Sequence, residues 1–187
     1  RDGVIDNGGQ TATACGIYQG LYDPDECPAA AKRLAELVRD NGYHIDCGIL
    51  GAKYIFSAPA EYGYDDVLYP MLTNPTYPSY AHWINSGMTT LCEDWGMENS
   101  LLHHMYSEVE LWFYRYLAGI RPAKPGFSEV IIQPHFLPDV GWGKARHRDI
   151  VLKWDADKLT IQTPVPAVLR MDGREEDLAP GSYIFPR

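Results

Sequence analysis

The chain has 187 residues, of which 45% are hydrophobic and 22% charged, so it can bury a sizeable core and is not a disordered segment. Its 16 basic and 25 acidic residues give a formal net charge of −9, which argues against nucleic acid and anionic membrane as partners and favours a neutral substrate. No apolar run reaches the roughly 18 residues of a membrane-spanning helix, so we expect no membrane insertion.

The first part of the chain, up to about residue 119, has apolar residues at helical spacing, interrupted by loops that contain glycine and proline. Helices are predicted at residues 28–39, 48–58 and 64–72, and the clearest one at about 104–118, where it ends at Gly119. Trp112, in the middle of that last helix, is predicted to be a core residue.

The pattern changes after Gly119, where the segment 121–127, RPAKPGF, breaks the helix and marks a boundary. Beyond it the period becomes two, which predicts short antiparallel strands joined by hairpins. Helices followed by strands indicate an α+β chain of two domains, which we place at 1–121 and 122–187. The predicted strands are 129–133, 150–154, 159–163, 168–171 and 182–185, the last two joined by a loop of sequence DGREEDLAPG.

The four cysteines are widely spaced and form no metal-ligand pattern, so we interpret them as free, mostly buried thiols. No metal and no cofactor is assigned. The chain begins at Arg1 rather than Met, which is compatible with a removed or upstream signal sequence. The compartment therefore stays open: periplasmic, secreted or cytoplasmic.

The stretch 89–95, TTLCEDW, is the candidate for chemistry because it places two carboxylates, Glu93 and Asp94, shortly after Tyr77 and Trp83. Glycoside hydrolysis uses two carboxyl groups: one protonates the leaving oxygen, and the other attacks the anomeric carbon or activates a water. Tyrosine and tryptophan rings can stack on sugars. Glu93 is therefore the candidate catalytic residue, and a solvated surface glutamate is the alternative. The carboxylates that compete with it are Glu98, Glu108 and Glu110.

The pair His103–His104 lies where a loop enters the last predicted helix. One imidazole there could hydrogen-bond a sugar hydroxyl, while a purely structural role is the alternative. As a metal site the pair is weak, because adjacent helical residues point about 100° apart.

Several motifs, taken in order, resemble bacterial α-L-rhamnosidases of glycoside hydrolase family 78, and the resemblance extends from Gln10 to the closing β-domain. They are GILG at 48–51, YPS at 77–79, WI at 83–84, GMTTLCEDW at 87–95, His103 with Val109 and Trp112, YRYLAGI at 114–120 and GFSEVIIQP at 126–134. Three positions depart from the family pattern: Cys92 in place of tryptophan, Leu102 in place of asparagine, and Ser107-Glu108 in place of a Gly-x pair.

This resemblance implies the C-terminal part of an (α/α)6 barrel followed by an antiparallel β-sandwich, and inverting hydrolysis of terminal α-L-rhamnose from glycosides or polysaccharides. It implies Glu93 as the general base, and Tyr77, Trp83, Trp95 and His103 as substrate-binding residues. About 110 residues hold roughly the last two or three hairpins of such a barrel, so the general acid is expected upstream of this chain.

Two further expectations follow from that length. The chain alone is expected to be inactive, and to pair with the upstream part of the same enzyme or with itself. The alternatives that the residues leave open are a non-catalytic carbohydrate-binding module and another α/α-barrel glycosidase or phosphorylase.

Overall fold

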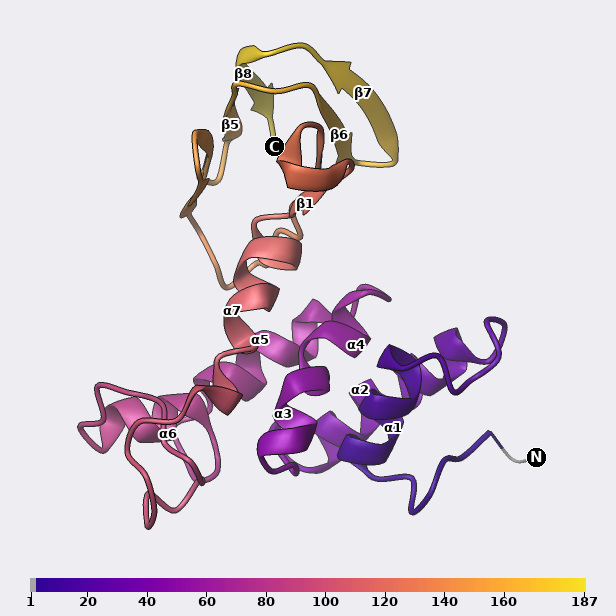
Figure 1. The fold of residues 1–187 in the computed structure, drawn as a ribbon, viewed down its shortest axis with the longest axis vertical. Helices are drawn as coiled ribbons and strands as arrows, with labels where there is room; N and C mark the ends of the chain where they lie inside the picture. The colour runs from indigo at the N-terminus through magenta and orange to yellow at the C-terminus, as the bar shows by residue number, and fades with distance from the viewer. Residues whose placement is uncertain (1–2) are drawn as a thin grey trace. The chain divides into compact units, whose positions relative to one another are not determined.

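The structure, a computed structural model, describes residues 3–187 and divides into two units, one of helices that ends at Trp112 and one mainly of strands from Phe113 to Arg187 (Figure 1). The predicted order, helices first and antiparallel-rich sheets afterwards, is confirmed. The predicted domain boundary at 121/122 lies inside the second unit and stays a prediction.

The helical unit contains longer helices near its start and short turns near its end. Its elements are α1 (Gln10–Tyr18), α2 (Cys27–Asp40), α3 (Ile49–Ile55), α4 (Ser57–Ala60), α5 (Asp65–Thr73), α6 (Tyr80–Asn85), the 3-10 turn η1 (His104–Tyr106) and α7 (Val109–Trp112). The predictions for 28–39, 48–58 and 64–72 correspond to α2, to α3 with α4, and to α5. Helices α1 and α6 were not predicted.

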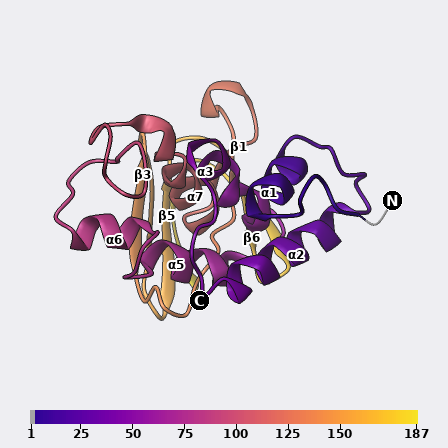
Figure 2. The same cartoon turned by 90° about the horizontal axis from the view of Figure 1, so that it is seen from below.

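Helix α2 has a proline in its first turn and one apolar face, the two sequence features that favour a helix here. Pro28 stands in the first turn, where its missing N–H costs nothing, and Leu34 and Val38 share one buried face with three alanines. The helix ends at Asp40, Asn41 is its C-cap, and Gly42 follows with a φ of +63°. Helix α1 lies against both α2 and α3 (Figure 2). The approach of α3 to α1 depends on Gly51, because a Cβ there would lie 2.6 Å from Thr11 Oγ1.

The predicted helix at 104–118 is not continuous, and this prediction was wrong in its geometry. The chain instead forms η1, the single α-turn α7, and a π-helix η2 (Phe113–Leu117). Ser107 Oγ donates to His104 O at 2.7 Å and so competes with the helical backbone after the first turn. The Ala118 N–H then bonds Phe113 O at 2.9 Å, five residues back, which widens the last turn.

Trp112 is fully buried, as predicted. Its indole Nε1 donates to Asp65 Oδ1 at 2.6 Å, and its ring lies 6.0 Å from the ring of Phe56. This hydrogen bond ties α7 to the first turn of α5 within the helical unit. A periodic pattern of apolar residues correctly predicted the burial of Trp112 even though the helix around it is broken.

The second unit is built from two four-stranded sheets, with strand orders β1-β2-β6-β7 and β3-β4-β5-β8. Every pairing in residues 3–187 is antiparallel except that of β2 with β6. Its elements are β1 (Ile120–Pro122), η3 (Pro125–Phe127), β2 (Val130–Ile132), β3 (Gly143–His147), β4 (Ile150–Trp154), β5 (Lys158–Thr163), β6 (Ala167–Met171), β7 (Arg174–Leu178) and β8 (Gly181–Pro186).

Alternation of apolar and polar residues explains which strands could be predicted. In β4, Ile150, Leu152 and Trp154 are buried while Lys153 is exposed, so the core-facing side is evident from the sequence. The predicted DGREEDLAPG loop is wrong, because it contains β7. That strand lies at the edge of its sheet and consists mainly of exposed charged residues, a composition that protects an edge but hides the strand pattern.

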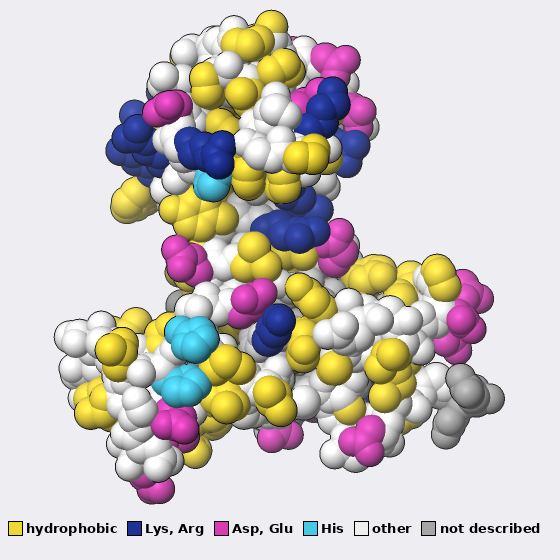
Figure 3. All heavy atoms as spheres, in the orientation of Figure 1, with side chains coloured by type: hydrophobic (Ala, Val, Ile, Leu, Met, Phe, Trp, Pro, Cys, Tyr) yellow, Lys and Arg dark blue, Asp and Glu magenta, His cyan; other side chains and the backbone are white. Residues whose placement is uncertain are grey.

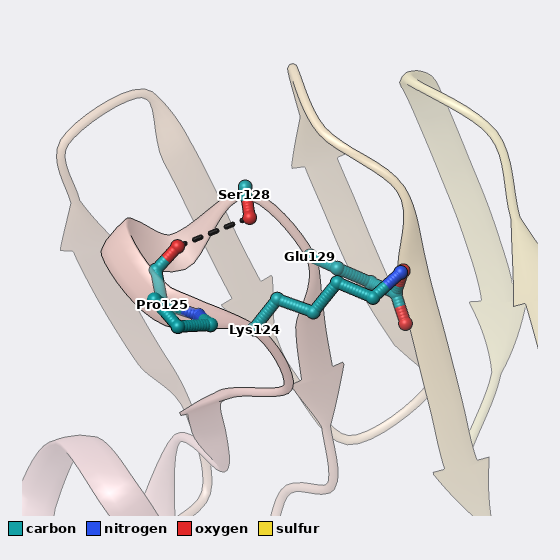
Figure 4. A network of polar contacts seen from close by, with 4 residues as sticks. All are labelled: Lys124, Pro125, Ser128 and Glu129. Atoms are coloured by element: carbon teal, nitrogen blue, oxygen red, sulfur yellow. Dashed lines mark hydrogen bonds and ion pairs between the residues drawn. The ribbon is translucent and has the colours of Figure 1, made fainter.

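The segment that joins β1 to β2 is held by a small polar network (Figure 4). Lys124 Nζ pairs with Glu129 Oε2 at 2.6 Å, and the N–H groups of Ala123 and Lys124 both donate to Glu129 O. Ser128 Oγ donates to Pro125 O at 3.0 Å and closes the intervening turn. The predicted break at 121–127 is therefore a tight turn within the second unit.

We expect Gly119→Ala to destabilise the second unit strongly. Gly119 has a φ of +72°, and a Cβ there would lie 2.0 Å from the backbone carbon of Gln133. The strained backbone and the clash together should cost about 3 kcal/mol, measured by urea unfolding. Gly126→Ala is the matched control, because Gly126 has a φ of +70° but open space around it, and it should cost only about 1 kcal/mol. Equal losses in both variants would contradict the role of the Gly119 contact.

Candidate active site

The loop between α6 and η1 folds back on itself and carries Glu93 on one arm and His103 on the other. The Glu93 N–H donates to Ser100 O at 2.8 Å, and the His103 N–H donates to Leu91 O at 2.7 Å. Thr90 Oγ1 adds a hydrogen bond to Leu101 O. We call residues 90–103 the paired loop. Its two arms bring the predicted catalytic residue and the predicted sugar-binding histidine together.

The carboxylate of Glu93 is held on one side. Its Oε2 accepts a hydrogen bond from the Ser100 N–H at 3.3 Å, while Oε1 has no hydrogen-bond partner among residues 3–187. The side chain is half-buried. Glu93 therefore keeps one acceptor oxygen that no side chain or backbone group of the described residues occupies.

His103 is fixed by the backbone of the turn that follows it. Its Nδ1 accepts a hydrogen bond from the Met105 N–H at 3.3 Å, so the neutral ring carries its proton on Nε2. The ring stacks against that of His104, with centroids 5.7 Å apart and planes 9° apart. Figure 3 shows two adjacent histidine side chains on the helical unit beside an acidic one. His103 thus serves as a cap for η1 and still has an Nε2–H donor.

Asp94 has a different function from its neighbour Glu93. It accepts hydrogen bonds from the Glu98 N–H at 3.2 Å and from both the N–H and Nδ2 of Asn99, at 3.1 and 2.9 Å. The Asn99 side chain, followed by the backbone N–H of Glu98, lowers the pKa of Asp94 below its ordinary value. Asp94 therefore closes the tip of the paired loop, and its oxygens are already used.

Two of the predicted binding residues, Trp83 and Trp95, are core residues, with 2% and 8% of their surfaces exposed. Their rings stack at a centroid distance of 4.5 Å and an angle of 29°. Trp83 Nε1 donates to Trp95 O, and Trp95 Nε1 donates to Cys47 O at 2.8 Å. The stack packs against the rings of Tyr80 and Tyr106 and forms a buried aromatic cluster, to which the paired loop contributes Trp95.

Burial of this aromatic cluster also sets the ionisation of its phenols. Burial raises the pKa of Tyr106 to about 12 and that of Tyr80 well above its ordinary value. Both phenols are therefore neutral at physiological pH, and Tyr80 Oη donates to Tyr106 O at 2.8 Å. The cluster presents no charge to the loop above it.

Tyr77 is the exposed member of the predicted set, with 56% of its surface accessible. Its bond to Pro78 is cis, and its ring meets that of His82 edge to face at 5.8 Å. A small pocket of about 210 Å³ lies beside the same region, lined by α6 and by residues 88–91. Trp83 lines this pocket together with Ile84 and Met88, which belong to the sequence motifs but were not predicted to bind substrate.

The competing carboxylates lie at the loop tip or near α7. Glu98 is exposed at the tip of the paired loop, and Glu108 and Glu110 lie at α7. Sequence reasoning missed Asn99 and Ser100, whose backbone and side-chain groups hold Asp94 and Glu93. Polar residues a few positions beyond an Asp are a turn signal that could have indicated this closure.

The cysteines are free, as predicted, and three of the four are buried. Burial raises the pKa of the Cys47 thiol to about 12, so it stays protonated. Among residues 3–187 no three His, Cys, Asp or Glu side chains form a group that could hold a metal ion. Within the same residues, no helix combines the length and apolar character needed to cross a membrane.

Comparison with known proteins adds a consistent set of similarities. Residues 1–117 match the model of the bacterial alpha-L-rhamnosidase 6 hairpin glycosidase domain. The chain is 30% identical over 175 residues to an alpha-L-rhamnosidase of an Alteromonas species. The matched segment covers 84% of this chain but only 19% of that protein. The chain thus spans about a fifth of the length of that curated relative.

Solved structures show the same fold. An alpha-L-rhamnosidase from Aspergillus terreus matches 99% of this chain and 24% of its own length, with a TM-score of 0.92 and 23% identity. The enzyme of Streptomyces avermitilis, solved in complex with L-rhamnose, matches 98% of this chain and 22% of its own, with a TM-score of 0.88 and 24% identity. The predicted resemblance and the predicted fold class are both confirmed.

We expect Asn99→Ala to raise the pKa of Asp94 towards its ordinary value, because it removes the largest cause of the lowered pKa. The contribution of Asp94 to stability is complete above the unfolded value of about 3.9 and is lost as the pH falls through the lower folded value. In Asn99→Ala that loss should begin at a higher pH. Carbon-13 NMR of the Asp94 carboxyl measures the shift. Asn85→Ala, an exposed asparagine at the end of α6, should leave the titration unchanged; an unchanged curve in both variants would contradict the assignment.

Proposed function

The chain belongs to the family of bacterial alpha-L-rhamnosidase 6 hairpin glycosidase domains, and on this premise we propose that it forms the C-terminal part of an inverting α-L-rhamnosidase. Such an enzyme releases terminal α-L-rhamnose from glycosides or polysaccharides. One observation supports the proposal above the others: the paired loop holds Glu93, with a free Oε1, next to the arm that carries His103.

In the proposed reaction Glu93 is the general base. Its carboxylate takes a proton from a water whose oxygen forms a bond to the anomeric carbon, on the face opposite the leaving group. The glycosidic C–O bond breaks at the same time, and a general acid from another part of the longer enzyme protonates the leaving oxygen. Inversion requires the two carboxyl groups to stand roughly 6.5–9.5 Å apart, so that the water fits between base and sugar.

The remaining predicted residues bind and orient the sugar in this proposal. His103 donates from Nε2 to a rhamnose hydroxyl, and Tyr77 offers an exposed ring for stacking. Trp83 contributes through the small pocket that it lines, and Trp95 contributes by holding Trp83 through their stack. The neutral aromatic cluster suits an uncharged sugar.

The chain is proposed to work with the rest of the same enzyme, or with a second copy of itself. It spans 19% of the Alteromonas relative, and its helical unit exposes apolar side chains that a folded core would bury. Leu50 and Leu21 at the surface of this unit are 70% and 63% exposed. Such residues support packing against further helical hairpins.

We expect Glu93→Gln in the full-length enzyme to lower kcat by about 100-fold or more, because glutamine cannot accept the proton of the attacking water. The Michaelis constant should change little, since the amide keeps the shape of the site. Hydrolysis of nitrophenyl α-L-rhamnoside provides the measurement. Glu98→Gln, in the same loop but exposed and outside the paired arms, is the matched control and should keep nearly full activity. The reverse result would transfer the role of base to Glu98.

The 187-residue chain alone should show negligible hydrolysis of nitrophenyl α-L-rhamnoside. It holds the proposed base, but the general acid that protonates the leaving oxygen is expected in another segment. Adding the remaining part of the enzyme as a separate chain should restore turnover if the two parts associate. Robust release of nitrophenol by the purified chain would refute the assignment of the acid to another segment.

A further inference from the structure

The second unit contains a cavity of about 570 Å³, which is larger than the pocket beside the paired loop. It lies between the segment that follows β2 and the β6–β7 hairpin, and every residue that lines it belongs to this unit. Its volume falls within the roughly 300–1,000 Å³ of known small-molecule sites. The activity proposed for the helical unit makes no use of this cavity.

The cavity has a topological cause. Strands β2 and β6 run parallel and are paired up to Ile132 and Leu169. Beyond Ile132 the chain turns to other partners: the Gln133 N–H donates to Gly119 O at 2.9 Å, and the His135 N–H donates to Tyr116 O at 3.1 Å. Strand β6 continues instead into its hairpin with β7. The two segments diverge at the carboxyl ends of their strands, and the cavity lies between them.

An ion pair forms the polar wall of the cavity. Arg170 and Glu175 stand directly opposite each other on β6 and β7, and Arg170 Nε donates to Glu175 Oε2 at 2.8 Å. Both side chains are partly exposed, at 44% and 60%, so the pair contributes little to stability. It does place a planar donor group beside a planar acceptor group, which is an arrangement that matches neighbouring hydroxyl groups of a sugar.

Phe136 also lines the cavity. Phe136 is half-buried, with the guanidinium of Arg187 4.1 Å from its ring centroid and the ring of Trp154 6.1 Å away. These contacts fix the ring in place, so binding beside it costs little conformational entropy. A rigid apolar edge next to planar polar groups is the usual composition of a carbohydrate site.

The charged residues that line the cavity indicate whether its ligand is neutral or anionic. Arg170 and Arg174 contribute two positive charges, and Asp172 and Glu175 contribute two negative ones. The wall is therefore formally neutral and offers no net attraction to an anionic group. Taken with the volume, the ion pair and the fixed ring, this balance favours an uncharged polyhydroxylated ligand over a phosphate or a uronate.

We propose that this cavity is a second saccharide-binding site, which takes a neutral oligosaccharide. Arg170 donates to, and Glu175 accepts from, sugar hydroxyls, while Phe136 packs against the apolar face of a sugar ring. The site is separate from the paired loop and does not depend on the activity proposed for it.

The test uses the 187-residue chain and two neutral probes, L-rhamnose and a rhamnosyl-glucose disaccharide, followed by nitrogen-15 NMR. The proposal predicts saturable shifts of the amides of residues 133–136 and 170–175 with the disaccharide. Arg170→Ala/Glu175→Ala removes both partners without leaving an unpaired charge, and should weaken that binding by about 10-fold or more. Arg146→Ala/Asp149→Ala removes a similarly exposed ion pair elsewhere in the unit and should change nothing.

Two results would overturn the proposal: shifts in 170–175 that never saturate, or equal affinity in the Arg170/Glu175 double variant and the unaltered chain. The variant His103→Ala separates this site from the proposed active site. Binding that disappears in His103→Ala but persists in the double variant would place the sugar at the paired loop alone. That outcome would refute the second site and leave the proposed function intact.

Discussion

The stack of Trp83 on Trp95 is the contact on which the geometry of the candidate active site depends. It joins helix α6 to the arm of the paired loop that follows Glu93, and the Trp95 indole extends the connection to Cys47 just before α3. Each indole N–H reaches a backbone oxygen, so the rings are buried without an unsatisfied donor. A loop whose tip is exposed is thereby anchored to the core on one side.

The two adjacent carboxylates of the paired loop, Asp94 and Glu93, make different contacts. Asp94 uses its oxygens to close the loop tip on Glu98 and Asn99, and its pKa is lowered by those same donors. Glu93 faces the other arm, is held through one oxygen, and keeps the other available. Glu93 and Asp94 lie at a bend that leads into the turn at Trp95–Gly96, and there the two neighbouring acids have different hydrogen-bond partners.

The fold could be predicted where burial leaves a periodic trace. Helix α2 and strands β4 and β5 each have one apolar face, so their type follows from spacing alone. Strand β7 has no such face because it lies exposed at a sheet edge, and it was mistaken for a loop. The break in the helix at Ser107 was also not predicted. The apolar spacing supports a continuous helix there, but the Ser107 side chain donates a hydrogen bond to His104 O and disrupts it.

The α+β order, the family resemblance and the free cysteines could all be predicted from the sequence, because each rests on local patterns or ordered motifs. The choice of Glu93 over the other carboxylates rests on the same kind of motif and stays a prediction. The core position of Trp83 and Trp95 is evident only in three dimensions, since their burial depends on partners as distant along the chain as Cys47. The cavity where β2 and β6 diverge could not be predicted either. Ile132 pairs with Leu169, which is distant along the chain, and such a pairing leaves no periodic signal in the sequence.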